Sequence, residues 1–240
     1  MARKITIWKE TTQHPISLIG EAAGVCWGAN TSDYFKNYNR GLDCLFSNHG
    51  RTLEFPQIYM TIEGFSAKMM RDLYSHIGGL PTRLQASTRY LDYKEFEYVE
   101  PHTIKTPEAK EIYNGCMDQI AEAISKLEDN GVPREDAANL LPLGYITKVV
   151  IRTNLRHLID MSHQRMCSRA YWEYREFMQE LIKALNEYGA KYTWELLDSD
   201  DNTVFAMNEW ERITSNYFKP KCEITGYCTE KKSCGRKNKR

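Results

Sequence analysis

The stretch that decides the fold is Tyr145-Ile-Thr-Lys-Val-Val-Ile-Arg152, followed at once by Thr153-Asn154-Leu-Arg156-His157-Leu-Ile-Asp160. The first part is rich in β-branched residues, which favour an extended strand. The second part has helical spacing, so a helix is expected over about residues 154–165. The chain is therefore expected to pass here from a strand directly into a helix.

Other strands and helices are predicted on both sides of this stretch. Ile58, Met60 and Ile62 alternate with other residues, which predicts a strand over 55–63, and a shorter alternation predicts one over 95–99. Helical spacing and capping residues predict further helices at 32–50, after Ser66, from Thr106 to Gly131, at 134–140 and at 169–188. Because strands and helices do not alternate regularly, the pattern indicates an α+β fold.

The composition is that of an ordinary globular protein. The 240 residues suit one large domain, expected over 1–220, with a cysteine-containing basic tail over 221–240. Thirty-two Lys and Arg balance thirty-two Asp and Glu, so no overall field attracts nucleic acid, and none is expected as a partner. No apolar stretch approaches the roughly 20 residues of a membrane span, and no signal peptide is recognisable, which predicts a cytoplasmic protein without a membrane partner.

Any anion must then be held by a local cluster of basic groups, and two segments offer one. The first is His76-Ile-Gly-Gly-Leu-Pro-Thr-Arg83-Leu-Gln85-Ala-Ser87-Thr-Arg89-Tyr90. Its glycines allow the backbone to approach a ligand closely, and Arg83 and Arg89 carry forked donors that suit a phosphate. A surface loop with ordinary arginines is the alternative, because this is neither a Walker nor a dinucleotide-binding fingerprint.

The second segment is the helix expected over 154–165. Asn154 and Arg156 lie in its first turn, where the backbone N–H groups and the helix dipole favour an anion. Arg165 lies about three turns further on. The alternative is that Arg156 forms an ion pair with Asp160, four residues along, on a solvated face.

Several motifs occur along the chain in a characteristic order. They are Glu21-Ala-Ala-Gly-Val-Cys26-Trp27, His49-Gly50, Ser87-Thr88-Arg89-Tyr90, Gly131-Val-Pro-Arg-Glu-Asp-Ala137, Asn154-Leu-Arg156-His-Leu158, Gln164-Arg165 and Ala170-Tyr-Trp-Glu173-Tyr-Arg175. In order and spacing they resemble the motifs of the flavin-dependent thymidylate synthase family. The tail, with Cys222, Cys228 and Cys234, resembles the tails of some members.

The resemblance implies a mixed, mainly antiparallel twisted sheet with flanking helices, assembled as a homotetramer. It also implies an enzyme that uses FAD, reduced by NADPH, to convert dUMP to dTMP with methylenetetrahydrofolate as carbon donor. Arg165, contributed across a subunit interface, is the implied catalytic residue, since a fixed guanidinium stabilises a developing anion. The substrate-binding residues are expected to be Arg83, Gln85, Ala86, Ser87, Thr88, Arg89 and Arg165. The FAD-binding residues are expected to be His76, Ile77, Asn154, Leu155, Arg156 and Asp160.

Departures from the family pattern concentrate on the groups that would bind an anion. The Arg-His-Arg that opens the signature is Ser75-His76-Ile77 here, and the later Asn-Glu pair is Leu84-Gln85. Ala138 occupies a position where the family commonly has a phosphate-binding arginine. A charged hydrogen bond contributes about 1.5–3 kcal/mol, so Arg83 or Arg51 is expected to replace some of these groups. A related one-carbon transfer to a pyrimidine nucleotide, such as hydroxymethylation of dUMP, is therefore the alternative activity.

The tail leaves two other interpretations open. Cys222, Cys228 and Cys234 are evenly spaced, with five residues between neighbours. Zinc sites commonly use pairs about two to four residues apart and need four ligands, so free thiols are preferred to a metal site. Six of the last ten residues are basic, which would suit a nucleic-acid-binding module, but the neutral net charge favours a solvated tail.

Overall fold

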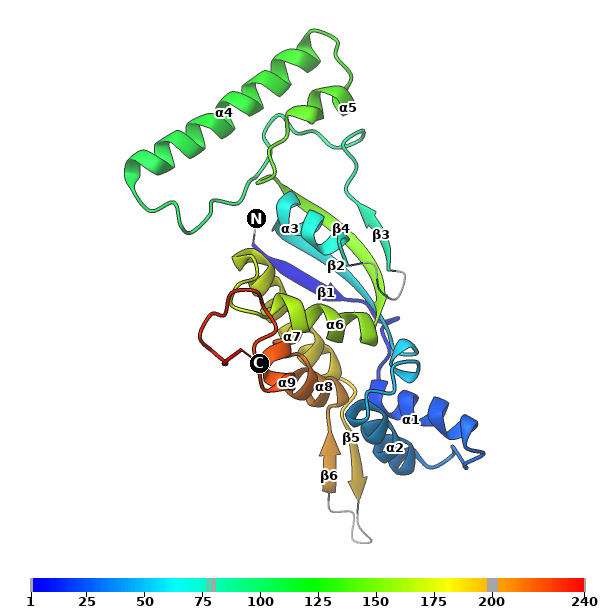
Figure 1. Ribbon diagram of the computed structural model, residues 1–240. Coiled ribbons are helices and arrows are strands. Elements are labelled where there is room, and N and C mark those ends of the chain that lie inside the picture. The colour runs from blue at the N-terminus through cyan, green and yellow to red at the C-terminus, as the bar shows by residue number, and fades with distance from the viewer. Residues whose placement is uncertain (1, 77, 79–80, 198–202, 240) are drawn as a thin grey trace. The chain divides into compact units, whose positions relative to one another are not determined.

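The computed structural model describes residues 2–76, 78, 81–197 and 203–239 (Figure 1). A four-stranded sheet has the order β1-β2-β4-β3, and β5 and β6 form a separate antiparallel hairpin. The strands are β1 Lys4–Ile7, β2 Gln57–Ser66, β3 Thr82–Gln85, β4 Ile146–Asn154, β5 Trp194–Leu197 and β6 Thr203–Met207. The prediction of an α+β fold with an antiparallel sheet is confirmed.

The helices are joined to the strands without a repeating strand–helix unit. They are α1 Pro15–Cys26, α2 Tyr34–Phe46, α3 Ala67–Tyr74, α4 Pro107–Asp129, α5 Arg134–Ala137, α6 Leu155–Arg165, α7 Trp172–Ala190, α8 Glu209–Tyr217 and α9 Lys221–Thr225, with short 3-10 turns at Thr52–Glu54 and Ala138–Leu140. Within the described residues, no helix is both long enough and apolar enough to cross a bilayer.

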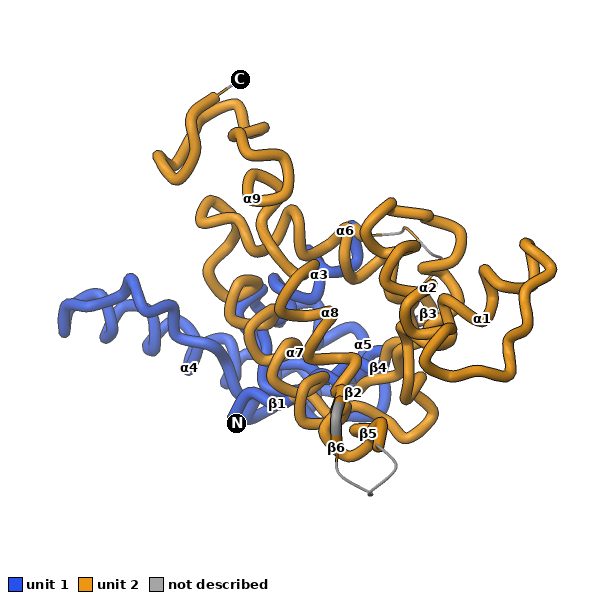
Figure 2. The backbone as a smooth tube through the Cα atoms, turned by 90° about the horizontal axis from the view of Figure 1, so that it is seen from below, with its two compact units in different colours: residues 1–4, 62–75, 83–150 blue, residues 5–61, 76–82, 151–240 orange. Residues whose placement is uncertain are grey.

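The chain divides into two compact units, coloured separately in Figure 2. Unit 1 comprises residues 1–4, 62–75 and 83–150, and unit 2 comprises residues 5–61, 76–82 and 151–240. The long strands β2 and β4 each contribute residues to both units.

Unit 1 confirms most of the local predictions made for it. The Ser66 hydroxyl accepts a hydrogen bond from the Met69 N–H and caps α3. Thr106 caps α4 in the same way, and Pro107 occupies its first turn, where its missing N–H costs nothing. Gly131, with φ of +83°, follows α4 in the left-handed conformation that glycine adopts without strain.

The strand predicted over 95–99 is wrong. The segment makes only an isolated antiparallel bridge between Tyr98 and Tyr145, with backbone hydrogen bonds to Gly144 and Ile146. The physical reason is that β4 already has β2 on one side and β3 on the other, and Ala86 donates to Lys148 on that second edge. Residues 95–99 therefore reach β4 only at its first residues.

Unit 2 contains a helix, α1, that the sequence patterns did not indicate. Its N-cap residue, His14, forms no capping hydrogen bond with its side chain. The buried carboxylate of Glu209, at the start of α8, accepts hydrogen bonds from Ile16 N at 2.6 Å and Ser17 N at 3.0 Å. It also accepts from the Ser17 hydroxyl and from Trp194 Nε1. The N-terminus of α1 is thus capped by a residue from the other end of the chain, which no local signal reveals.

Residues 221–239 are mostly exposed, as expected of a tail, but they also form a defined backbone structure. They begin with α9, turn at Gly226 with φ of +79°, and return so that Cys228 N donates to Asn238 O at 2.8 Å. Cys228 is buried, while residues 229–239 are exposed as predicted. The segment therefore has a fixed path despite its polar composition.

Candidate functional site

The segment that carries the predicted substrate contacts lies in unit 1, where it forms β3 and the turn that follows. The Gln85 side chain accepts a hydrogen bond from the Tyr74 hydroxyl at 2.9 Å. Its Nε2 donates to Thr147 Oγ1 at 3.3 Å and to the Tyr145 hydroxyl at 3.4 Å. Both the oxygen and the nitrogen of the Gln85 amide are thus hydrogen-bonded, so this amide has a fixed orientation beside β4.

Arg83 is also held in place. Its guanidinium carbon lies 4.6 Å from the centre of the Tyr74 ring, a cation–π contact. Burial raises the pKa of Tyr74, while the charge of Arg83 lowers it. The phenol therefore stays neutral and its ring remains a suitable platform for the arginine.

Ser87 organises the turn that precedes Arg89. The Ser87 hydroxyl accepts from Arg89 N at 3.2 Å, and its carbonyl accepts from Leu91 N at 3.2 Å. Ala86 N donates to Lys148 O at 2.8 Å. Several backbone N–H groups of this turn are thus engaged within the protein, and the Ser87 and Thr88 side chains are half-buried.

Arg89 lies beside a shallow pocket of about 270 Å³. The pocket is lined by Arg89, Tyr90, Pro133, Arg134 and Glu135. Arg89 Nε pairs with Glu135 Oε2 at 3.0 Å, and both side chains are more than half exposed. Such an exposed pair is worth about 0–1 kcal/mol, so an anion can replace Glu135 at little cost.

The second cluster lies in unit 2 and contains His76 and Arg165. Arg165 Nε donates to His76 Nε2 at 2.8 Å. Burial, followed by the positive charge of Arg165 and the His157 ring, lowers the pKa of His76 to about 4. His76 is therefore neutral at pH 7, with its Nε2 lone pair facing the guanidinium.

Aromatic rings support this pair. The guanidinium carbon of Arg165 lies 4.8 Å from the centre of the Tyr174 ring, which is fully buried on α7. The His76 ring centre lies 5.9 Å from that of Tyr174 and 6.2 Å from that of His157. His157 is itself fixed, because its Nδ1 lies 2.5 Å from Thr153 Oγ1. The result is a half-buried arginine whose orientation is set from two sides.

Several groups in the first turn of α6 that could bind an anion already form hydrogen bonds or an ion pair within the protein. Asn154 is the N-cap, and its Oδ1 accepts from His157 N at 2.9 Å. Leu155 has a fully buried side chain, and its N–H donates to Pro56 O at 3.0 Å. Arg156 is exposed and pairs with Glu54 at 2.8 Å. Asp160, also exposed, lies further along the same helix.

Arg156 lies against the turn that contains Gly50. A Cβ added to Gly50 would stand 2.9 Å from the guanidinium carbon of Arg156, so the end of the Arg156 side chain would have to shift. The pocket beside it has a volume of about 330 Å³ and is lined by Arg51, Glu54, Phe55 and Gln57. This concave region combines an arginine, a carboxylate, an amide and an exposed ring, donors and surfaces that a large planar ligand with phosphates can use.

Arg152 is a residue of this region that the sequence interpretation missed. Its two terminal nitrogens donate to Gln57 Oε1 and to Thr82 Oγ1, both at 3.2 Å. The period of two along β4 was the available signal, because Lys148, Val150 and Arg152 share its less buried face. Ile77, the remaining predicted cofactor residue, lies outside the described residues.

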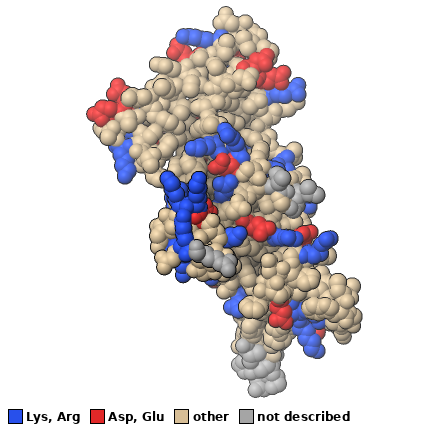
Figure 3. Space-filling view, viewed as in Figure 1, with Lys and Arg blue, Asp and Glu red and all other residues tan. Residues whose placement is uncertain are grey.

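Each of the clusters of candidate site residues lies within one compact unit. On the face shown in Figure 3, basic and acidic side chains are interspersed, in keeping with the zero net charge. The structure places the Gln85–Arg89 group within unit 1 and the His76–Arg165 and Arg156 groups within unit 2. Fold and site together define an α+β protein with several arginines held by neighbouring rings and hydrogen-bond partners.

Comparison with known proteins names the family. The sequence model of the thymidylate synthase complementing protein family matches residues 9–188, three-quarters of the chain. The chain belongs to this family, that of the flavin-dependent thymidylate synthases, and the resemblance seen in its motifs is confirmed.

Curated relatives have similar lengths. The chain is 29% identical to the flavin-dependent thymidylate synthase of Geobacter sulfurreducens over 182 residues, which cover 72% of this chain and 78% of the relative. It is 28% identical to that of Pyrococcus furiosus over 234 residues, which cover 92% and 87% of the two chains.

Solved structures show the same fold. Thymidylate synthase X from Helicobacter pylori, crystallised with FAD and dUMP, matches with a TM-score of 0.61 at 18% identity and covers 80% of this chain and 97% of its own. The UMP/dUMP methylase PolB from Streptomyces cacaoi, bound with 5-Br dUMP, matches with a TM-score of 0.64 at 17% identity and covers 78% and 91%.

Proposed function

We propose that this chain is a flavin-dependent thymidylate synthase, which methylates dUMP reductively to dTMP with methylenetetrahydrofolate, FAD and NADPH. The observation that carries the proposal is the family match over residues 9–188. It is supported by the binding of FAD and dUMP in the Helicobacter pylori relative of the same fold.

The Arg165 guanidinium is assigned the catalytic role, which is to hold the uracil ring and favour negative charge at its N3. When bound, the flavin supplies the hydride chemistry. His76 orients Arg165 through the 2.8 Å hydrogen bond to Nε. Because the low pKa of His76 keeps it neutral, it accepts this bond without adding a second positive charge. A preorganised donor of this kind stabilises developing charge without reorganising during the reaction.

Residues of both units are assigned to binding. For dUMP they are Arg83, Gln85, Ala86, Ser87, Thr88 and Arg89, with Arg89 exchanging Glu135 for the phosphate. For FAD they are His76, Ile77, Asn154, Leu155, Arg156 and Asp160, of which Leu155 has a buried side chain and packs behind the others. The pocket beside Arg156 adds an arginine, an amide and an exposed ring, from Arg51, Gln57 and Phe55, which suit a flavin with phosphates.

The organisation of the protein is proposed on the same family grounds. A single domain over 1–220 with a tail over 221–240 would assemble as a homotetramer in the cytoplasm, and Arg165 would act on the nucleotide of a neighbouring subunit. Sedimentation velocity on the purified protein tests the tetramer, which a monomer at micromolar concentration would contradict.

The decisive experiment is product analysis. The purified chain is incubated with FAD, NADPH, methylenetetrahydrofolate and dUMP, and the nucleotide product is identified by mass spectrometry. A mass increase of one methylene group supports the proposal. A protein that binds FAD but forms no dTMP contradicts it, and a product heavier than dUMP by CH2O establishes hydroxymethylation of dUMP instead.

A second candidate is methylation of UMP as well as dUMP. PolB, which has the same fold, is a UMP/dUMP methylase. This chain lacks several of the family's usual anion-binding groups, including an arginine at Ala138, which is buried here. Running UMP and dUMP in parallel discriminates the two candidates, because equal turnover of both nucleotides would contradict specificity for the deoxy sugar.

A further inference from the structure

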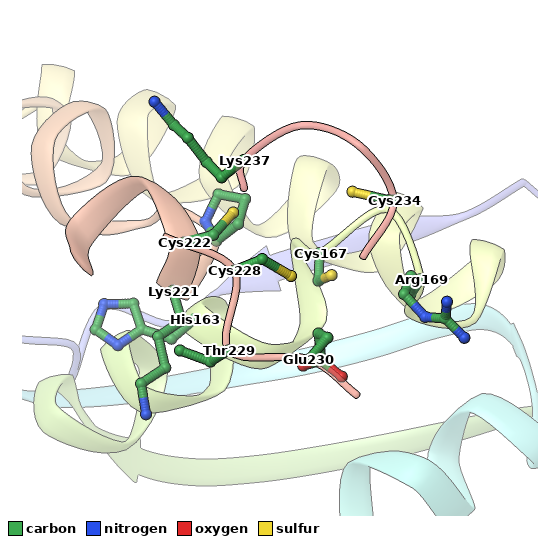
Figure 4. Close-up of a pocket in the computed structure, with 11 residues that line it drawn as sticks. His163, Cys167, Arg169, Lys221, Cys222, Cys228, Thr229, Glu230, Cys234 and Lys237 are labelled. Carbon is green, nitrogen blue, oxygen red and sulfur yellow. The ribbon is translucent and has the colours of Figure 1, made fainter. Parts of the chain in front are cut away.

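Four cysteines from separate parts of unit 2 line one small pocket (Figure 4). Cys167 follows α6, Cys222 lies on α9, and Cys228 and Cys234 lie in the C-terminal segment. In Figure 4 the side chains of Cys167, Cys222 and Cys228 surround the pocket, with Cys234 further along the loop. Cys167 is 55 residues or more from the others in sequence, so the spacing of the tail cysteines alone could not reveal it.

The space between them suits an ion rather than an organic molecule. Its volume is about 20 Å³. That is close to the roughly 10–15 Å³ that one water molecule requires, and far below the 300 Å³ or so of a small-molecule site. Neither a nucleotide nor a flavin can enter it.

The charges around the pocket favour thiolates. Arg169, Lys221 and Lys237 line it together with a single acid, Glu230. A surplus of positive charge offsets the negative charge that several thiolates would bring.

The C-terminal segment has little apolar burial to hold its shape. Of residues 221–239, all of which the structure describes, Cys228 alone is buried. Yet the segment forms α9, a left-handed turn at Gly226 and a backbone bridge between Cys228 and Lys239. Small segments without an apolar core generally require a metal ion or a disulfide to fix them.

We propose that Cys167, Cys222, Cys228 and Cys234 bind Zn²⁺ as a structural ion that fastens the C-terminal segment to the turn after α6. Tetrahedral coordination by four thiolates is a common structural zinc site. Binding releases the four thiol protons to solvent and leaves a complex with two net negative charges, which Arg169, Lys221 and Lys237 offset.

Binding requires the cysteine side chains to turn inward. Among the described residues, no group of three or more His, Cys, Asp or Glu side chains is already arranged to hold a metal ion. All seven cysteines are free thiols, and a change between staggered χ1 rotamers redirects each sulfur. Coupling of metal binding to such ordering is usual for structural zinc. The inference is independent of the proposed enzymatic activity.

Metal analysis of the reduced full-length protein tests the inference. After incubation with Zn²⁺ and removal of the excess, about one zinc per chain is expected by elemental mass spectrometry. Cobalt in place of zinc is expected to give the visible bands of a tetrahedral thiolate complex. Cys167→Ser and Cys228→Ser are each expected to weaken zinc binding at least about tenfold. Cys116→Ser, at an exposed cysteine on α4, is the matched control and retains the zinc.

Two results would overturn the inference. One is wild-type protein that retains no zinc although all its thiols are reduced. The other is a disulfide among these four cysteines, found by mass spectrometry of the unreduced protein, that forms equally in the presence of Zn²⁺. A chelator is also expected to lower the thermal midpoint of the wild type but not of Cys228→Ser, and equal shifts in both proteins would contradict a site at Cys228.

Discussion

Acidification tests the charge state assigned to His76. In the folded protein burial lowers the pKa of His76 to about 4, against 6.5 for an ordinary histidine. A proton therefore binds the unfolded chain more readily than the folded one between these values. The stabilisation that neutral His76 contributes is complete above about pH 6.5 and is lost progressively as the pH falls towards 4.

The magnitude follows from the two pKa values. At about 1.36 kcal/mol for each pH unit between them, the ceiling is about 3.4 kcal/mol. Because His76 is only half-buried, solvent screening reduces the expected loss to about 1–2 kcal/mol. His76→Gln keeps an acceptor for Arg165 and does not titrate, so the loss should be absent from that variant.

Urea denaturation followed by circular dichroism at pH 7, 6, 5 and 4.5 measures the effect. The free energy of unfolding of the wild type, minus that of His76→Gln, is expected to fall steadily over this series. His14 and His163, whose pKa values burial also lowers, are present in both proteins and cancel. His49→Gln, at an exposed histidine, controls for loss of an imidazole and should follow the wild type. Parallel pH profiles for wild type and His76→Gln would refute the reasoning.

Three further predictions concern single side chains. Arg165→Lys removes the hydrogen bond from Nε and the planar contact with Tyr174, so dTMP formation should fall about 10–100-fold for a loss of about 1.5–3 kcal/mol, while FAD binding, measured by absorbance, persists; unchanged turnover would contradict the catalytic assignment. Glu209→Gln should lower the free energy of unfolding by about 2–4 kcal/mol, because a buried carboxylate that caps α1 is lost, whereas Glu211→Gln, exposed on the same helix, should change it little. Gly20→Ala should be severely destabilising in thermal unfolding, since its Cβ would lie 1.7 Å from the Asn37 carbonyl oxygen; Gly115→Ala, with open space around it, should be neutral or slightly stabilising, and similar midpoints for the two would disprove the close α1–α2 packing.

Predictions from local sequence succeeded where the stabilising partner is also local. Ser66 and Thr106 cap their helices through N–H groups three residues along, so the start of each helix was predictable from the sequence around it. Alternation likewise located most of β2, predicted over 55–63 and observed over Gln57–Ser66.

Predictions failed where the partner is distant in sequence. The α1 helix depends on Glu209, and β3, which has mostly exposed side chains, has no apolar alternation of its own. The segment over 95–99 has the alternation of a strand but finds little of β4 left to pair with. In each case a partner distant in the sequence decided the outcome, and such a partner leaves no local pattern.

The candidate site also has some features that the sequence predicted and others that it could not. The motifs identified the family and Arg165, but not that His76 is neutral and bonded to Arg165, nor that Arg152 bridges Gln57 and Thr82. A pKa depends on desolvation and on charges that folding brings near, and neither can be read from adjacent residues.

The sequence by itself determined the fold class, the locally capped helices and the order of the family motifs, because these depend on interactions within a few residues. Only the tertiary structure decided the charge state of His76, the fixed orientations of Gln85 and Arg165, and the meeting of Cys167 with the three cysteines of the tail. These features arise from burial and from contacts between residues far apart in the chain, which exist only once the chain has folded.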